Sequence, residues 1–88
     1  MNEWFDCTLV AIGFLSEGRG YFRVLELPAR STRIHTLRGK WRTLDQAEQV
    51  VSDQWSEGMC IVVDPMDLTE EIERRNVLLA RYQESENE

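Results

Sequence analysis

The sequence predicts a small, single α+β domain whose elements follow the order β-β-β-α-β-α. Three observations support this class: apolar residues alternate over much of residues 4–38, two later stretches repeat them at helical spacing, and a short β-branched run separates those stretches. Each helix carries one apolar stripe and the sheet needs a cover, so we expect a mixed, mainly antiparallel sheet covered on one face by two helices. A chain of 88 residues provides one core, and we place the domain at residues 1–83.

The first two strands are expected to form a β-hairpin. Apolar residues occupy alternate positions between Trp4 and Leu15, and a second strand-like pattern runs from Tyr21 to Leu27. Gly18 and Gly20 lie between them. Glycine readily adopts the positive φ angles that a tight turn requires, so this segment is the expected turn.

The second face of the first strand is partly apolar too, because Val10, Ile12 and Phe14 lie on it. Two alternatives remain open. These side chains form an exposed hydrophobic patch through which a homodimer or another partner binds, or the sheet curls and buries them.

A third strand is expected at residues 32–38, where β-branched residues alternate with charged ones. Pro28 ends the second strand before it, because proline lacks the N–H that a ladder needs. The first helix follows at Thr43, which can form a capping box with Gln46. The apolar residues of this helix are Leu44, Ala47, Val50, Val51 and Trp55, and Gly58 is expected to end it.

The run from Met59 to Val63 is apolar at every position, which is typical of a strand buried on both faces. We therefore expect it in the centre of the sheet. Asp64 and Pro65 end this strand, and Asp67 is expected to cap a second helix from Leu68 to Gln83.

The second helix has an apolar stripe that one charged residue interrupts. Leu68, Ile72, Leu79 and Tyr82 share a face, and Arg75 falls among them. Val77 points roughly the other way, which indicates a second contact surface on the helix. The acidic residues 84–88 are expected to form a disordered tail.

Charge is divided between the two halves of the chain. Residues 1–42 carry seven Arg/Lys against four Asp/Glu, whereas residues 43–88 carry three against twelve. The halves therefore contribute +3 and −9 to the net charge of −6. Such a division predicts two electrically different surfaces.

No catalytic motif is present. The only histidine, His35, would have to be the general base for any nucleophile. Both thiols, Cys7 and Cys60, lie in strands that are expected to be buried, where the thiolate is disfavoured. Asp64 is explained by the turn that it begins, and Asp67 by its role as a helix cap. We therefore predict that the protein is not an enzyme.

Metal and cofactor sites are not expected either. The cysteines lie 28 and 25 residues from His35, and no Cys-x-x-Cys or His-x-x-x-His pair occurs. We expect a cytoplasmic protein with reduced cysteines, although the sequence leaves a disulfide between them open. No secretory signal and no apolar stretch of membrane-spanning length is found.

The basic residues cluster in one segment that has the composition of a nucleic-acid contact, with cations for phosphates and an aromatic ring for stacking. The alternative is a solvated strand edge on which positive charges prevent edge-to-edge pairing. The candidate nucleic-acid-binding residues are Arg30, Arg33, Arg38, Lys40, Trp41 and Arg42.

The acidic residues of the second half form the other candidate surface. The alternative is a purely structural explanation: amphipathic helices have polar outer faces, and carboxylates favour helix N-termini. The candidate partner-binding residues are Asp53, Glu57, Asp64, Asp67, Glu70, Glu71 and Glu73.

An acidic chain of pI about 4.7 is an unusual nucleic-acid binder, so we favour a protein partner with a basic surface. In size, charge and lack of catalytic motifs the chain resembles anti-CRISPR and anti-restriction inhibitors of phages and mobile elements, although no alignable motif is shared. The resemblance implies an inhibitor or regulator that occupies a nucleic-acid-binding surface. The alternative is a weak nucleic-acid-binding protein that uses the segment from Arg30 to Arg42, as a monomer or as a dimer.

Overall fold

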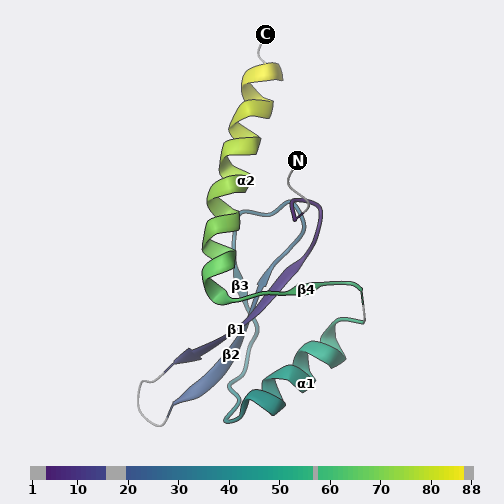
Figure 1. The fold of residues 1–88 in the computed structure, drawn as a ribbon, viewed down its shortest axis with the longest axis vertical. Helices are drawn as coiled ribbons and strands as arrows, with labels where there is room; N and C mark the ends of the chain where they lie inside the picture. The colour runs from purple at the N-terminus through teal and green to yellow at the C-terminus, as the bar shows by residue number, and fades with distance from the viewer. Residues whose placement is uncertain (1–3, 16–19, 57, 87–88) are drawn as a thin grey trace.

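The computed structural model of the chain describes residues 4–15, 20–56 and 58–86. They form a four-stranded mixed sheet with two helices, in the predicted order (Figure 1). The strands are β1 (Leu9–Leu15), β2 (Tyr21–Leu27), β3 (His35–Thr36) and β4 (Ile61–Val62), and the helices are α1 (Leu44–Gln54) and α2 (Pro65–Glu86). The predicted fold class is confirmed.

The sheet is built around the antiparallel pair of β1 and β2, in which Leu9 lies opposite Leu27 and Gly13 opposite Arg23. β3 pairs antiparallel with β2, and β4 pairs parallel with β1, so the strand order is β3-β2-β1-β4. β3 is shorter than the predicted strand at residues 32–38, and an isolated bridge between Phe22 and Trp41 continues the pairing along β2.

The two helices cover opposite faces of the sheet, which corrects the prediction that they share one face. Leu9 and Ala11 of β1 pack with Leu68 of α2, whereas Val10, between them, packs with Ala47 and Val51 of α1. Successive side chains of a strand point to opposite faces, so the helices must lie on different sides. The physical reason is that β1 is apolar on both faces and each face needs its own cover.

This arrangement decides between the alternatives for Val10, Ile12 and Phe14. Val10 is fully buried beneath α1, and Ile12 is half-buried in the same cluster. Phe14 remains 59% exposed, with its ring centroid 5.0 Å from that of Phe22. The predicted exposure of the patch is therefore wrong for Val10, which α1 covers, and it holds for Phe14.

The position of β4 is a second correction. The strand lies at the edge of the sheet instead of the centre, and Val62 is 60% exposed. Only one side of β4 pairs, with β1, because the chain turns at Asp64 directly into α2. The apolar run that predicts a doubly buried strand does not encode whether a further strand follows.

Both helices begin with the capping chemistry that short polar residues provide. The capping box of Thr43 and Gln46 is confirmed, although α1 ends at Trp55 in an extended conformation, before Gly58. At α2 the predicted cap is displaced by one turn. The backbone N–H of Asp64 donates to Oδ2 of Asp67 over 3.2 Å, and Pro65 occupies the first helical position, where proline is favoured.

α2 is longer than predicted, and it makes the molecule elongated. The helix continues to Glu86, where the sequence predicts a tail from residue 84, and residues 87 and 88 lie outside the described residues. The principal extents are 53 × 29 × 19 Å and the radius of gyration is 15.0 Å. A compact chain of this length has a radius of gyration of about 12 Å, and Figure 1 shows the C-terminal half of α2 projecting beyond the sheet.

α2 is fixed to the sheet by a fully buried arginine, Arg75. Its Nε donates to Oε2 of Glu71 over 3.1 Å. Nη1 donates to the carbonyl oxygens of Pro28 and Ser31 over 2.7 and 2.9 Å, and Nη2 to those of Trp4 and Cys7. An arginine has five N–H groups, and each of them has an acceptor here. We call this arrangement the Arg75 cluster.

Replacement of Arg75 by methionine is expected to lower the free energy of unfolding by about 3–5 kcal/mol, because it leaves the buried carboxylate of Glu71 unpaired and removes one hydrogen bond from each of four carbonyl oxygens. Urea unfolding followed by tryptophan fluorescence measures this loss. The exposed Arg81 provides the control, since Arg81→Met should change stability by about 0.5 kcal/mol or less. Equal stability of the two variants would contradict the role of the cluster.

Candidate functional site

The outer face of α2 carries an exposed stripe of apolar and acidic residues. Met66 is 75% exposed and Val77 is 53% exposed, and the exposed Glu70 and Glu73 lie between them. Steps of four, three and four residues place all of them on one side of a helix. This side lies opposite Leu68, which is buried against the sheet. We call these four residues the outer α2 stripe.

The predicted acidic residues in α2 and directly before it differ in how far their side chains are exposed. Glu71 is 2% exposed and belongs to the Arg75 cluster, so its predicted role in partner binding is wrong. Asp67 is half-buried and accepts the N–H of Asp64, which is itself exposed. Glu70 and Glu73 are exposed within the helix. These two carboxylates are therefore the exposed part of the predicted acidic surface within α2.

The remaining predicted acidic residues lie near the end of α1. Asp53 is exposed, and its Oδ1 accepts a hydrogen bond from the side-chain amide of Gln49 over 3.0 Å. Glu57 lies outside the described residues. α1 also carries the exposed Asp45 and Glu48, so its outer surface is acidic independently of α2.

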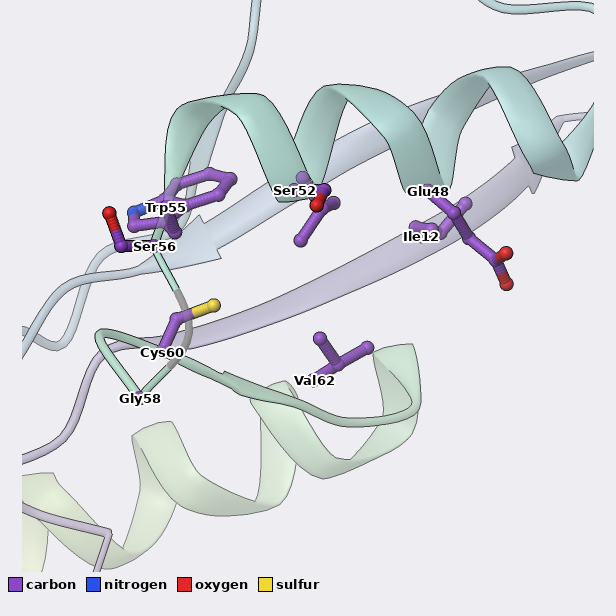
Figure 2. Close-up of a pocket in the computed structure, with 9 residues that line it drawn as sticks. Ile12, Glu48, Ser52, Trp55, Ser56, Gly58, Cys60 and Val62 are labelled. Atoms are coloured by element: carbon purple, nitrogen blue, oxygen red, sulfur yellow. The ribbon is translucent and has the colours of Figure 1, made fainter.

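A hollow of about 530 Å³ opens between α1 and β4. Figure 2 shows Glu48, Ser52 and Trp55 descending from α1 on one side, with Val62 pointing up towards them from β4. The lining residues are Ile12, Glu48, Val51, Ser52, Trp55, Ser56, Gly58, Cys60 and Val62. We call this feature the α1–β4 hollow.

Cys60 is the one thiol of the hollow, and it is not an activated nucleophile. Burial, followed by the nearby carboxylate of Glu26, raises the pKa of the Cys60 thiol above its ordinary value. Cys7 packs on the α2 side of the sheet and Cys60 on the α1 side. The described structure contains both as unbridged cysteines, so the disulfide that the sequence left open is not formed.

Alkylation of Cys60 by iodoacetamide is expected to be slower than that of a free cysteine at pH 8, because the raised pKa keeps the thiol protonated. The rate should rise with pH to a midpoint above the ordinary thiol pKa. The pKa of the Cys60 thiol is higher in the folded protein than in the unfolded chain. The free energy of unfolding should therefore fall as the pH rises from the unfolded-state pKa to the folded-state pKa. Mass spectrometry on a Cys7→Ala variant measures the profile, and a midpoint below the ordinary value would contradict it.

The basic segment lies along the opposite edge of the sheet from β4. Arg33, Arg38 and Arg42 are exposed there. Arg30 and Lys40 are exposed too, but each has a local contact: Nε of Arg30 lies 2.6 Å from Oδ1 of Asp6, and Nζ of Lys40 lies 4.6 Å from the centre of the Tyr21 ring.

Trp41 is half-buried against the α1 side of the core, so packing competes with the predicted base-stacking role of its ring. His35 is exposed on β3, whereas Cys60 precedes β4 at the other edge. In the described parts of the chain, no three His, Cys, Asp or Glu side chains gather as metal ligands would. None of the described helices combines the length and apolar character needed to cross a membrane.

Part of this surface is visible in the sequence once the start of α2 is known. The spacing of Met66, Glu70, Glu73 and Val77 follows from the numbering, but a helix predicted to begin at Leu68 excludes Met66. The α1–β4 hollow has no such signal, because it depends on where two separate elements meet.

Comparison of the chain with protein-family models, with curated proteins and with solved structures finds no match.

Proposed function

We propose that the protein is a non-enzymatic, acidic interaction module that docks the outer α2 stripe into a basic, nucleic-acid-binding surface of a partner protein. The observation that carries this proposal is the exposure of Met66 and Val77 at the two ends of a stripe whose middle is acidic. Helices that bind grooves use residues at this spacing as anchors.

The dimensions of the stripe suit such a contact. Eleven residues separate Met66 from Val77, which corresponds to about 16 Å along a helix. Two large apolar side chains can anchor the helix, and Glu70 and Glu73 can meet cations between them. The projecting part of α2 makes the Val77 end accessible to a partner groove (Figure 1).

Charge supports a basic partner. Between Thr43 and Glu73 the chain contains nine Asp/Glu and no Lys or Arg, so α1, β4 and the first turns of α2 form a continuous acidic region of sequence. Such a region accelerates encounter with a positively charged protein and disfavours nucleic acid itself. A module that occupies a phosphate-binding groove would act as an inhibitor or regulator of a nucleic-acid-handling complex, as the anti-CRISPR and anti-restriction character of the chain implies.

The double variant Glu70→Lys/Glu73→Lys is expected to weaken inhibition by about 10-fold or more, because it places cations against a cationic groove. The measurement is competition with labelled DNA for purified CRISPR effectors and restriction enzymes, followed by fluorescence anisotropy.

Asp45→Lys/Glu48→Lys on α1 is the matched control for this experiment, since it changes the net charge equally on exposed residues outside α2 that are not among the predicted partner-binding residues. It should retain inhibition within about threefold. Absence of inhibition across the panel, or equal losses in the two double variants, would remove the proposal.

The second candidate function is weak nucleic-acid binding by the basic edge. The exposure of Arg33, Arg38 and Arg42 along one side of the sheet favours it, whereas the pairing of Arg30 with Asp6 and the packing of Trp41 reduce the available contacts.

A mobility-shift titration at about 50 and 200 mM salt separates the two functions. Each neutralised phosphate contributes about 0.9 to the slope of log affinity against log salt, so a binder with three or four contacts loses most of its affinity over this range. We expect no shift of labelled DNA at either salt concentration. Binding at low salt that Arg33→Glu/Arg38→Glu abolishes would favour the second candidate.

A further inference from the structure

We propose that the free edge of β4, together with the α1–β4 hollow, binds an extended segment of a partner that carries an apolar side chain with lysine or arginine two positions away, and that this segment adds to the sheet as a further strand. The site lies on a different surface from the outer α2 stripe, so it stands independently of the proposed function.

β4 has backbone groups that are directed away from the sheet. The N–H of Ile61 donates to the carbonyl oxygen of Thr8, and the N–H of Val63 to that of Val10, each over 2.9 Å. Backbone groups alternate in direction along a strand. The N–H and C=O of Val62 are therefore directed towards the open edge, where an added strand would form its hydrogen bonds.

This edge lacks the features that protect an edge strand from pairing. Edges are commonly protected by charged side chains, by proline within the strand or by bulges. The other edge of the sheet has exposed Arg33 and Arg38 on either side of β3. β4 consists of Ile61 and Val62, both exposed, and the first charge and proline follow only after Val63. The shortness of β4 is its one protective feature.

The α1–β4 hollow gives an added strand a place for a side chain. Val62 lines the hollow from β4, so the same face of a neighbouring strand opens onto it (Figure 2). Alternate side chains of that strand would point towards α1. The apolar surfaces of Ile12, Trp55 and Val62 suit an apolar or aromatic side chain, and the volume of about 530 Å³ falls within the range of ligand pockets.

Charge selects the occupant. Glu48 lines the hollow and the exposed Asp64 follows β4, and neither α1 nor β4 carries a basic residue. Lysine or arginine two positions from the inserted residue, on the same face of the added strand, would complement these carboxylates. The same acidic residues disfavour pairing of β4 with β4 of a second copy. β4 could also pair with the basic β3 edge of a second copy, and the test below distinguishes this contact from binding of a partner segment.

The experiment is selection from a phage-displayed library of eight-residue peptides, followed by anisotropy with the best synthetic peptide. We expect enrichment of peptides in which Lys or Arg lies two positions from an apolar residue. Val62→Pro removes the outward N–H and leaves the two inward hydrogen bonds to the backbones of Thr8 and Val10, so it should weaken binding at least 10-fold, whereas Val62→Ala should weaken it less.

A second pair of variants tests the hollow without changing the strand. Ser52→Tyr fills the hollow from α1 and should abolish binding, whereas Gln49→Tyr, on an exposed position of α1 outside the hollow, should leave it unchanged. Circular dichroism confirms the fold of each variant, and if Val62→Pro does not fold, the Ser52 pair decides. Glu70→Lys/Glu73→Lys must keep peptide affinity, which separates this site from the outer α2 stripe.

Three results would overturn the proposal: no enrichment, equal binding by Ser52→Tyr and Gln49→Tyr, or enrichment without basic residues. Sedimentation of the protein alone tests the second copy. A monomer supports the partner segment, whereas self-association that both Val62→Pro and Arg33→Glu/Arg38→Glu abolish would assign the edge to another copy of the chain.

Discussion

The hydrogen bonds of Arg75 are the interaction on which the arrangement of the molecule depends. Trp4 and Cys7 precede β1, and Pro28 and Ser31 follow β2, so the carbonyl oxygens of these four residues lie in segments without a regular ladder. Backbone oxygens that are removed from water need donors. One guanidinium donates to all four and joins both segments to α2, while Glu71 balances its charge. The oxygens of Trp4 and Pro28 also accept the backbone N–H groups of Cys7 and Ser31. The position of α2, and with it the direction of the outer α2 stripe, follows from this contact.

The order of elements, the hairpin and the capping box of α1 could be predicted because each depends on neighbouring residues. The distribution of the helices over two faces could not. β1 shows apolar residues on both faces, but its sequence does not say which element covers each. Arg75 shows the same limit. Its interruption of an apolar stripe is visible, yet its carbonyl acceptors lie 44 to 71 positions away in the chain.

The candidate site divides in a similar way. Helical phase predicts a second contact surface at Val77, and the exposure of Val77 agrees with that phase. Charge alone places Glu71 in the acidic surface, although its spacing of three from Leu68 and four from Arg75 puts it on the packed face. Charge therefore describes the character of the surface, and helical phase decides which carboxylates belong to it. Neither charge nor helical phase shows where the two candidate surfaces lie relative to each other. The strand order does, because it puts the basic segment and β4 at opposite edges of the sheet.

The long reach of the Arg75 cluster also sets the order in which the chain can fold during synthesis. The β1–β2 hairpin is synthesised before α2, so the carbonyl oxygens around it lack the hydrogen bonds from Arg75 until α2 has been made. Contacts of such large sequence separation form late and slow the folding of small domains. Until residue 75 has emerged, the α2 face of the sheet has no cover, so the nascent hairpin exposes Leu9, Ala11 and Leu27. The fold is therefore completed only after α2 has been synthesised.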